Sequence, residues 1–340
     1  MPGLMTQLEI GPLTLRNRIV MPPMANNKAT HDGDVTEQLI QHYLKFASSL
    51  GLLIVEHAYV SRAGRLHPNQ LAISDMANGP GLTRLVAALR QTRVPAAIQI
   101  THAGGRTTEE ATGAPPFGPS ALLQPRAKEA ARELTGGQMT SIRRSFGDAA
   151  RRAKRAGFDA VEIHGAHGYL LNQFFSPLTN QRTDQYGGSR EARLRYPLEV
   201  VATVRGAVGP DYPILYRLGA DDLMPGGLTA DDAAWAAPRL VEAGVDMLDL
   251  SGGIGGSQPP GGDREGYFDY LGQAVKAVVD IPVMVTGGIK SPAEADRLVR
   301  EGWADLVGVG RALLADPRWA EKAVAELGAE LDHPGGGGPV

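Results

Sequence analysis

The most constraining feature of this 340-residue chain is a regular alternation of short apolar runs with helix-length amphipathic stretches. The runs are almost continuous in Val, Ile and Leu, which is typical of strands buried on both faces of a parallel sheet. They lie at residues 18–25, 52–60, 96–103, 159–164, 214–220, 246–252, 282–289 and 305–310. The helical stretches lie at 36–50, 81–92, 140–156, 190–208, 229–243, 267–279, 292–301 and 317–327. Eight of each favour the α/β fold called a (β/α)8 TIM barrel, which needs about 250 residues, over a doubly wound open sheet.

The residues beyond this minimum fall in three places. Residues 4–17 are expected to form an N-terminal hairpin at the barrel floor, and residues 104–138 and 169–189 form long loops after the third and fourth strands. Active sites of such barrels lie at the C-terminal ends of the strands, so the two long loops are expected to border one. We predict a single domain over 1–330, followed by a flexible glycine-rich tail over 331–340.

Composition excludes several classes of function. The chain has no cysteine, which rules out disulfides, a cysteine nucleophile, and any cysteine-bound zinc or iron–sulfur cluster. Its 34 Lys and Arg against 37 Asp and Glu leave no basic footprint for nucleic acid. No apolar run approaches the roughly 20 residues that span a bilayer, and the N-terminus does not resemble a signal peptide. We therefore expect a soluble, cytoplasmic protein.

Glycines end the last two predicted strands. Gly287 and Gly288 follow the seventh strand, and Gly310 and Arg311 follow the eighth. Barrels commonly hold a phosphate group at this position, where small residues let the backbone approach the oxygens and an arginine adds a bidentate contact. The alternative is that these glycines serve only tight turns. Two pairs at the expected strands favour a phosphate.

Two polar residues interrupt otherwise apolar strands. Arg217 lies in the fifth strand, which contains no carboxylate near it, so we expect its charge to meet an anionic ligand. Gln99 lies in the third strand, and its amide offers both a donor and an acceptor to an imide edge. An anion at Arg217, an imide at Gln99 and a phosphate at Arg311 together describe flavin mononucleotide (FMN).

The densest group of candidate catalytic residues is His164, His167 and Tyr169, at the end of the fourth strand. One interpretation makes the histidines hydrogen-bond donors to a substrate oxygen and the tyrosine a proton donor. A second makes the histidines metal ligands, completed by Glu56 or Glu162. A third leaves both histidines as core residues without a catalytic role.

The run EIHGAHGYLLNQFFSPLTNQRTDQYGGS at residues 162–189 is the most specific motif of the chain. Supporting motifs lie at residues 15–24, 118–122, 132–135 and 307–311. With these motifs the chain resembles the Old Yellow Enzyme family of FMN-dependent NAD(P)H oxidoreductases over residues 4–327. The length and the absence of cysteine resemble the short members, which have a barrel alone.

The resemblance implies a role for each matching position. The residues expected to contact FMN are Pro22, Pro23, Met24, Ala25, His57, Gln99, Arg217, Ser251, Gly287, Gly288, Gly310 and Arg311. His164 and His167 would bind the oxygen of an electron-withdrawing group, Tyr169 would protonate the substrate, and Asn27 would lie beside it. No metal is implied.

The implied reaction is ping-pong. NAD(P)H would reduce the flavin, and hydride would then pass from flavin N5 to an activated C=C bond, as in an α,β-unsaturated carbonyl compound. Alternatives are a reductase of nitro compounds or nitrate esters, a flavin dehydrogenase of another small substrate, a metal-dependent lyase or hydrolase, and a non-catalytic flavin-binding protein. The expected partners are a small electrophilic alkene and further copies of the chain, in a dimer or tetramer.

Several positions depart from the family pattern. Ala25 stands where members usually carry Cys or Thr, and because alanine donates no hydrogen bond we expect a lowered flavin reduction potential. Asn27 replaces a tyrosine that short members often place against the substrate. The usual His-Ala-Gly-Arg reads with Gly105 in the fourth place, and Arg106 comes one residue late. The C-terminal arginine that some short members lend to a neighbouring subunit has no counterpart in 333–340.

Overall fold

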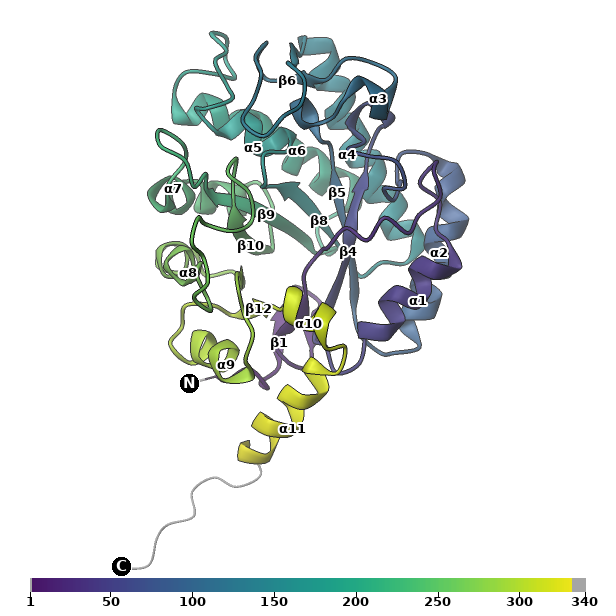
Figure 1. The fold of residues 1–340 in the computed structure, drawn as a ribbon, viewed down its shortest axis with the longest axis vertical. Helices are drawn as coiled ribbons and strands as arrows, with labels where there is room; N and C mark the ends of the chain where they lie inside the picture. Colours follow the sequence, from purple (N-terminus) through teal and green to yellow (C-terminus); the bar gives the residue numbers. More distant parts are fainter. Residues whose placement is uncertain (1, 332–340) are drawn as a thin grey trace, which may run out of the picture.

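A closed barrel of eight parallel strands forms the centre of the molecule (Figure 1), in a computed structural model that describes residues 2–331, with side chains to 328. In chain order the strands are β3 (Ile19–Met21), β4 (Leu52–Tyr59), β5 (Ala96–Thr101), β8 (Ala160–Gly165), β9 (Ile214–Asp221), β10 (Met247–Gly252), β11 (Val283–Thr286) and β12 (Leu306–Gly308). Each strand pairs with the next, and β12 pairs with β3 to close the ring. The (β/α)8 TIM barrel predicted from the sequence is confirmed.

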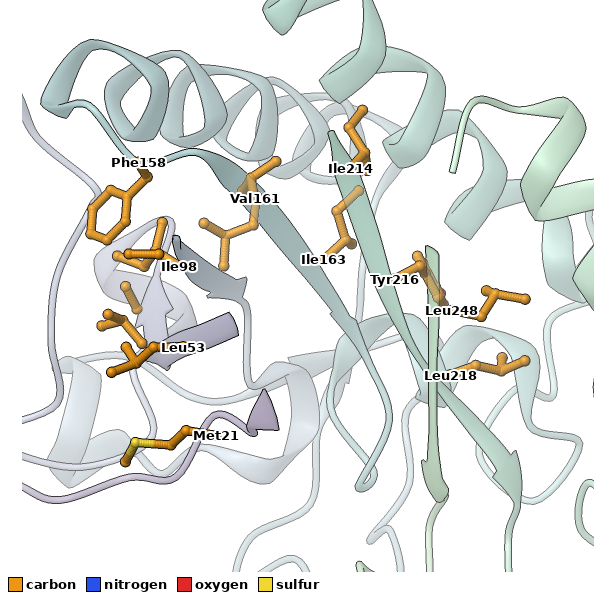
Figure 2. Packing of buried hydrophobic residues seen from close by; sticks show 14 of the residues in the cluster. Met21, Leu53, Ile98, Phe158, Val161, Ile163, Ile214, Tyr216, Leu218 and Leu248 are labelled. Atoms are coloured by element: carbon orange, nitrogen blue, oxygen red, sulfur yellow. The ribbon is translucent and has the colours of Figure 1, made fainter. Parts of the chain in front are cut away.

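Helices surround the barrel and cover its outer face. The long ones are α1 (Glu37–Phe46), α2 (Gly79–Arg90), α4 (Gly136–Ala156), α6 (Arg190–Val208), α7 (Ala230–Glu242), α8 (Asp269–Lys276), α9 (Pro292–Arg300) and α11 (Trp319–Leu331). Outward-facing strand residues such as Val161, Ile163 and Ile214 pack beneath them in the largest hydrophobic cluster (Figure 2). Burial of this apolar layer stabilises the barrel at about 25 cal/mol per Å² of apolar surface.

Two of the element boundaries that differ from those expected have a clear local cause. The first barrel strand ends at Met21 rather than at residue 25, because Pro22 and Pro23 have no N–H to continue the ladder. The third long helix, α4, begins at Gly136, four residues before the predicted start. A capping box sets this start: the Thr135 hydroxyl accepts from the Gln138 N–H at 3.3 Å, and the Gln138 side chain accepts from the Thr135 N–H at 2.9 Å.

The expected N-terminal hairpin is present. Strand β1 (Leu8–Ile10) pairs with β2 (Leu13–Leu15) in antiparallel fashion. Ile10 and Leu15 join a cluster of buried side chains from the beginnings of the barrel strands, and this cluster fills the N-terminal half of the barrel. Its other members are Val20, Leu52, Ile54, Ala97, Ala160, Leu215, Met247, Met284 and Leu306.

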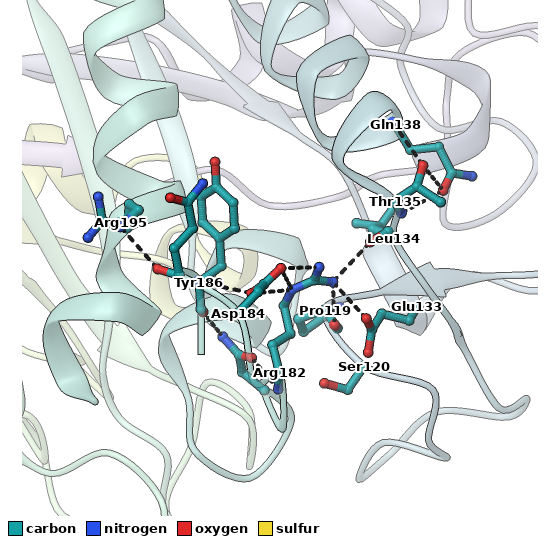
Figure 3. Close-up of polar contacts among 12 residues, drawn as sticks. Pro119, Ser120, Glu133, Leu134, Thr135, Gln138, Arg182, Asp184, Tyr186 and Arg195 are labelled. Atoms are coloured by element: carbon teal, nitrogen blue, oxygen red, sulfur yellow. Dashed lines mark hydrogen bonds and ion pairs between the residues drawn. The ribbon is translucent and has the colours of Figure 1, made fainter. Parts of the chain in front are cut away.

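The long loops after β5 and β8 cross above the opposite end of the barrel. The first contains η3 (Gly104–Arg106), α3 (Glu109–Thr112) and the short parallel pair β6 (Phe117–Gly118) and β7 (Arg132–Glu133); the second contains α5 (Leu170–Phe175). Arg182 ties them together (Figure 3). Its Nη1 donates to the carbonyls of Pro119 (3.0 Å) and Leu134 (2.9 Å), while Asp184 accepts from its Nε and Nη2.

The structure tests only some of the expectations about membrane spans, the C-terminal tail and the organisation of the chain. No helix within 2–331 is long and apolar enough to cross a membrane. Apart from residue 331, at the end of α11, the predicted flexible tail lies outside the described residues. The single domain over 1–330, the cytoplasmic location and the dimer or tetramer stay predictions.

Candidate active site

A cavity of about 590 Å³ opens at the C-terminal ends of the barrel strands. All twelve residues predicted to contact FMN line it, together with His164, His167 and Tyr169. Asn27 does not line it; this residue is exposed, with φ of 57°. The lining residues that sequence reasoning missed are Ser257, Gln258, Tyr267, Thr286, Ile289, Lys290, Gly308 and Ala312. Most of these come from the loops after β10 and β11, which carry no recognisable pattern.

Gln99 and Arg217 line the floor of the cavity, and the carboxyls of Glu162 and Asp249 lie beside them on neighbouring strands. Each of these four side chains is at most 5% exposed. The Gln99 amide donates to Glu162 Oε2 on the neighbouring strand at 2.6 Å. Arg217 Nε lies 3.0 Å from Asp249 Oδ2, directly opposite on β10, although the two atoms are not aligned for a hydrogen bond. The expectation that Arg217 lacks a carboxylate partner is therefore wrong. The partner comes from the strand register, which the pattern within one strand does not reveal.

The two floor carboxyls differ in charge. Burial raises the pKa of Glu162 well above its usual value, and the nearby Asp249 raises it further. Burial also raises the pKa of Asp249, to about 6, but the Arg217 guanidinium and a hydrogen bond from Thr286 oppose this shift. Near neutral pH we therefore expect Glu162 to carry a proton and Asp249 to be ionised. The ionised Asp249 partly compensates the Arg217 charge, and the Arg217 side chain lines the cavity.

The catalytic candidates stand together on the segment that follows β8. The rings of His164 and His167 are 5.1 Å apart between centroids, and those of His164 and Tyr169 are 4.8 Å apart. His164 Nδ1 accepts from the Ala166 N–H at 3.2 Å, so its Nε2 carries the proton. His167 Nε2 lies 2.8 Å from Ser251 Oγ, and a φ of 56° turns the residue out of the strand direction.

These imidazoles are neutral at ordinary pH. Burial holds the pKa of His164 and His167 well below the usual value, and neighbouring rings and Arg217 lower both further. Burial likewise lowers the pKa of His57 to about 3. The Gln70 amide lies 2.8 Å from His57 Nδ1, and it fixes that ring at the cavity wall. Neutral imidazoles can donate hydrogen bonds to an oxygen without giving up a full proton.

The Tyr169 phenol keeps its proton. Burial raises its pKa above the usual value, and the opposing effects of Arg106, Arg126 and Arg217 are smaller. The residue precedes α5, and its ring lies 5.6 Å from the His57 ring between centroids. A protonated phenol beside two neutral imidazoles can deliver a proton to a bound substrate.

The other end of the cavity carries positive charge. Arg311 follows Gly310 at the end of β12, and it donates to Gln258 Oε1 at 2.9 Å and to the Tyr267 hydroxyl at 3.3 Å. Lys290, from the loop after β11, lines the same end. Two cations beside glycine-rich backbone suit a phosphate group.

The metal alternative finds no support in this geometry. Within residues 2–331 no three His, Asp or Glu side chains come together in a way that could hold a metal ion. The carboxylates considered as further ligands are engaged elsewhere, since Glu162 accepts from Gln99 and Glu56 accepts from the Asn26 N–H at 2.9 Å.

Comparison with known proteins agrees with this geometry. The sequence pattern of the NADH:flavin oxidoreductase / NADH oxidase family matches residues 4–330. The chain belongs to this family. It is the Old Yellow Enzyme family that the motifs indicated.

Individual relatives differ in length. The chain is 44% identical over 329 residues to an NADH oxidase of Thermoanaerobacter brockii, of which it spans 50%. It is 38% identical over 325 residues to an NADPH dehydrogenase of Geobacillus thermodenitrificans, of which it spans 94%. In both cases 95% of this chain is matched. The chain thus spans about half the length of some relatives and nearly all of others. Among solved structures, morphinone reductase superposes with a TM-score of 0.84 at 31% identity, covering 100% of this chain and 94% of that one.

The residues of the cavity fit FMN. One end offers the cations Arg311 and Lys290 to a phosphate, and the other offers Arg217 and Gln99 to a polar ring edge. The flat segment 22–25 supplies an apolar wall between them. Gly310 keeps this passage open, because a Cβ there would lie 3.3 Å from Met24 Sδ.

Proposed function

We propose that the protein is an FMN-dependent NAD(P)H oxidoreductase that reduces activated C=C bonds of α,β-unsaturated carbonyl compounds. The observation that carries this proposal is the group of two neutral imidazoles and one protonated phenol at one wall of the cavity. Such a group can bind a carbonyl oxygen and protonate a carbon in the same event. FMN, when bound, supplies the hydride chemistry by accepting hydride from NAD(P)H and returning it to the alkene.

His164 and His167 hold the carbonyl oxygen in this proposal. His164 points its protonated Nε2 away from the backbone that fixes Nδ1. Negative charge develops on the oxygen as the alkene accepts hydride, and donors that are already oriented stabilise it. Because both rings are neutral, they bind the ketone and the enolate-like state without first losing a proton.

Tyr169 supplies the proton to the carbon next to the carbonyl. Its hydroxyl stays protonated in the buried site, so the proton is available when charge reaches that carbon. The nearby cations Arg106 and Arg126 stabilise the phenolate that remains.

The other cavity residues position the cofactor. Gln99 and Arg217 would hold the pyrimidine edge, where the Arg217 charge would favour the reduced, more negative ring. Residues 22–25, His57 and Ser251 would line the ring system, and Gly287, Gly288, Gly310 and Arg311 would hold the phosphate, with Lys290 as a further cation.

Replacement of the proposed proton donor tests this assignment. In Tyr169→Phe the reoxidation of the flavin by 2-cyclohexenone should slow by about a hundredfold to ten-thousandfold, which is the usual range for loss of a general acid. Flavin reduction by NAD(P)H needs no proton from Tyr169 and should change far less. Anaerobic stopped-flow absorbance measures the two half-reactions separately. Tyr270→Phe, outside the cavity lining, is the control. Equal slowing of both half-reactions would refute the role of Tyr169.

A further inference from the structure

A further arginine, Arg106, lies close to the segment that carries His167 and Tyr169. Arg106 ends the short η3 helix after β5. A Cβ on Gly168 would lie 3.5 Å from its Nη1 and 3.7 Å from the Ile254 Cα. Because Gly168 separates His167 from Tyr169, the guanidinium stands at the junction of the loops that follow β5, β8 and β10, and its charge acts on the Tyr169 hydroxyl.

Among the residues that the structure describes, Arg106 has no acidic partner. Its Nε and Nη1 are buried, and within the described part of the chain neither has a hydrogen-bond partner. After burial, the groups that shift its pKa are Arg126 and the Tyr169 hydroxyl, neither of them a carboxylate. A buried arginine elsewhere in the fold has its donors satisfied: Arg65 donates from Nε and Nη2 to the Ala111 carbonyl and from Nη1 to the His31 carbonyl. An unsatisfied guanidinium at this place is therefore not a general property of the fold.

A second cation stands at the same rim. Arg126 has a φ of 64°, and its Nη1 occupies the space that a Cβ on Gly256 would need. Its side chain is exposed, and its charge acts on His167, Tyr169 and Arg106. Neither arginine lines the cavity itself; both lie close to the segment that carries His167 and Tyr169. Two guanidinium groups that repel one another are stabilised when an anion binds between or beside them.

The backbone around Arg106 is fixed in place. Gln173 Nε2 donates to the carbonyls of Ala103 at 2.9 Å and Gly168 at 2.6 Å, and its Oε1 accepts from the Gly105 N–H at 3.0 Å. The Gly168 N–H donates to Asn172 Oδ1 at 2.8 Å. One buried amide thus joins the segment that carries Arg106 to the segment that carries Tyr169, and the backbone from which the cation extends is held in position.

We propose that Arg106, assisted by Arg126, binds a carboxylate on the substrate, so that the preferred alkenes carry an acid group in addition to the activating carbonyl. The inference rests on the function proposed above and names its substrate class. A carboxylate matches the planar guanidinium in two-point contact. The charge belongs to the substrate because Arg106 lies beside the residue that protonates the reacting carbon, whereas in NAD(P)H a ribose separates the nicotinamide from the phosphates.

A pair of substrates that differ only in charge tests this proposal. Trans-4-oxo-2-pentenoate carries an enone and a carboxylate, and its methyl ester is the neutral match. The reduced holoenzyme is mixed with each in anaerobic stopped-flow, and the rate of flavin reoxidation is followed against concentration. We expect wild type to prefer the acid, and Arg106→Gln to lower the acid-to-ester preference by about tenfold to a hundredfold, since hydrogen bonds to charged groups contribute on that scale.

Two further variants sharpen the test. Arg106→Lys keeps the charge but not the planar fork, and should restore part of the preference. Arg132→Gln removes an exposed arginine from the same long loop after β5 and should leave the acid-to-ester preference as in wild type.

Three results would overturn the proposal. The first is an equal loss with acid and ester in Arg106→Gln, which would make the residue structural. The second is a loss confined to flavin reduction by NADH or NADPH, which would assign the cations to a cofactor phosphate. The third is a wild type without preference for the acid. A wild type that NAD(P)H bleaches but that neither acid nor ester reoxidises would remove the proposed function itself.

Discussion

The two halves of the barrel interior are built from the same strands but differ completely in chemistry. Ala97, Ala160, Leu215 and Met247 belong to the apolar cluster in the N-terminal half. Two residues further along the same four strands stand the buried polar residues Gln99, Glu162, Arg217 and Asp249, of which Gln99 and Arg217 line the cavity. Because side chains alternate along a strand, each pair faces the barrel interior in neighbouring layers. Two residues along each strand thus separate an apolar layer, the lower layer, from a polar layer next to the cavity, the upper layer.

The free energy of burying side chains has opposite signs in the two layers. Apolar burial in the lower layer is favourable throughout. Burial of ionisable groups in the upper layer carries a desolvation penalty that pairing rarely repays in full. The raised pKa of Glu162 and Asp249 reports that penalty. We infer that the upper layer is retained for its action on the cofactor, and that changes in the two layers have separable effects.

The largest expected effect on stability comes from the lower layer. Leu215→Ala should lower the free energy of unfolding by about 2–5 kcal/mol, because it leaves a cavity in a fully buried cluster. The flavin reduction potential should stay the same. Urea unfolding and potentiometric titration measure the two quantities, with the exposed Leu123→Ala as control. A shift in potential would show that the layers are not independent.

A change in the site should have the converse effect, a large loss of activity with a smaller loss of stability. His167→Ala removes one of the two proposed oxygen donors and should lower kcat/KM for 2-cyclohexenone by about a hundredfold to a thousandfold. The free energy of unfolding should change less than in Leu215→Ala. Steady-state kinetics provides the comparison, with the exposed His31→Ala as the matched control. An activity within a fewfold of wild type would contradict the role of His167.

A smaller effect distinguishes the two carboxyls of the upper layer. Asp249→Asn removes a negative charge 3.0 Å from Arg217 Nε, so the reduced flavin is favoured and the two-electron potential should rise by about 30–60 mV. Glu162→Gln replaces a carboxyl that already holds its proton and should shift the potential much less. Potentiometric titration against a reference dye at pH 7 measures both. Equal shifts would contradict the assigned charges.

The smallest expected effect is on the pH dependence of the free energy of unfolding. Burial raises the pKa of Glu56 to about 7, above the usual 4.5, so the folded protein holds this proton more tightly than the unfolded chain. Its stabilising contribution is therefore complete below pH 4.5 and is lost as pH rises through about 7. Glu56→Gln should remove about 1–3 kcal/mol of this dependence in unfolding experiments between pH 5 and 8. The exposed Glu9→Gln should not, and an unchanged slope in Glu56→Gln would disprove the assignment.

The barrel and most of the site were predictable because both depend on local patterns. Near-continuous apolar runs marked each strand, and polar residues such as Gln99, Arg217 and His164 stood out against them. Residues at the C-terminal ends of the strands lie together at one end of the barrel, independently of the loop conformations. Residues expected at the ends of all eight barrel strands accordingly line one cavity.

What escaped prediction depends on contacts between distant segments. The ion pair of Arg217 with Asp249 follows from strand register, and Arg182 serves to tie two loops together although it lies within the most specific motif. Lys290 and Tyr267 reach the cavity from loops without a pattern. Asn27, expected beside the substrate, is not in the lining because the chain turns outward after Ala25.

The most direct test of the proposed function is a spectral cycle on the purified holoenzyme. Under anaerobic conditions, NADPH or NADH should bleach the flavin absorbance, and one equivalent of 2-cyclohexenone should restore it with formation of cyclohexanone. A flavin that stays bleached with the enone but recovers its colour with a nitro compound or a nitrate ester would contradict the proposed reduction of C=C bonds.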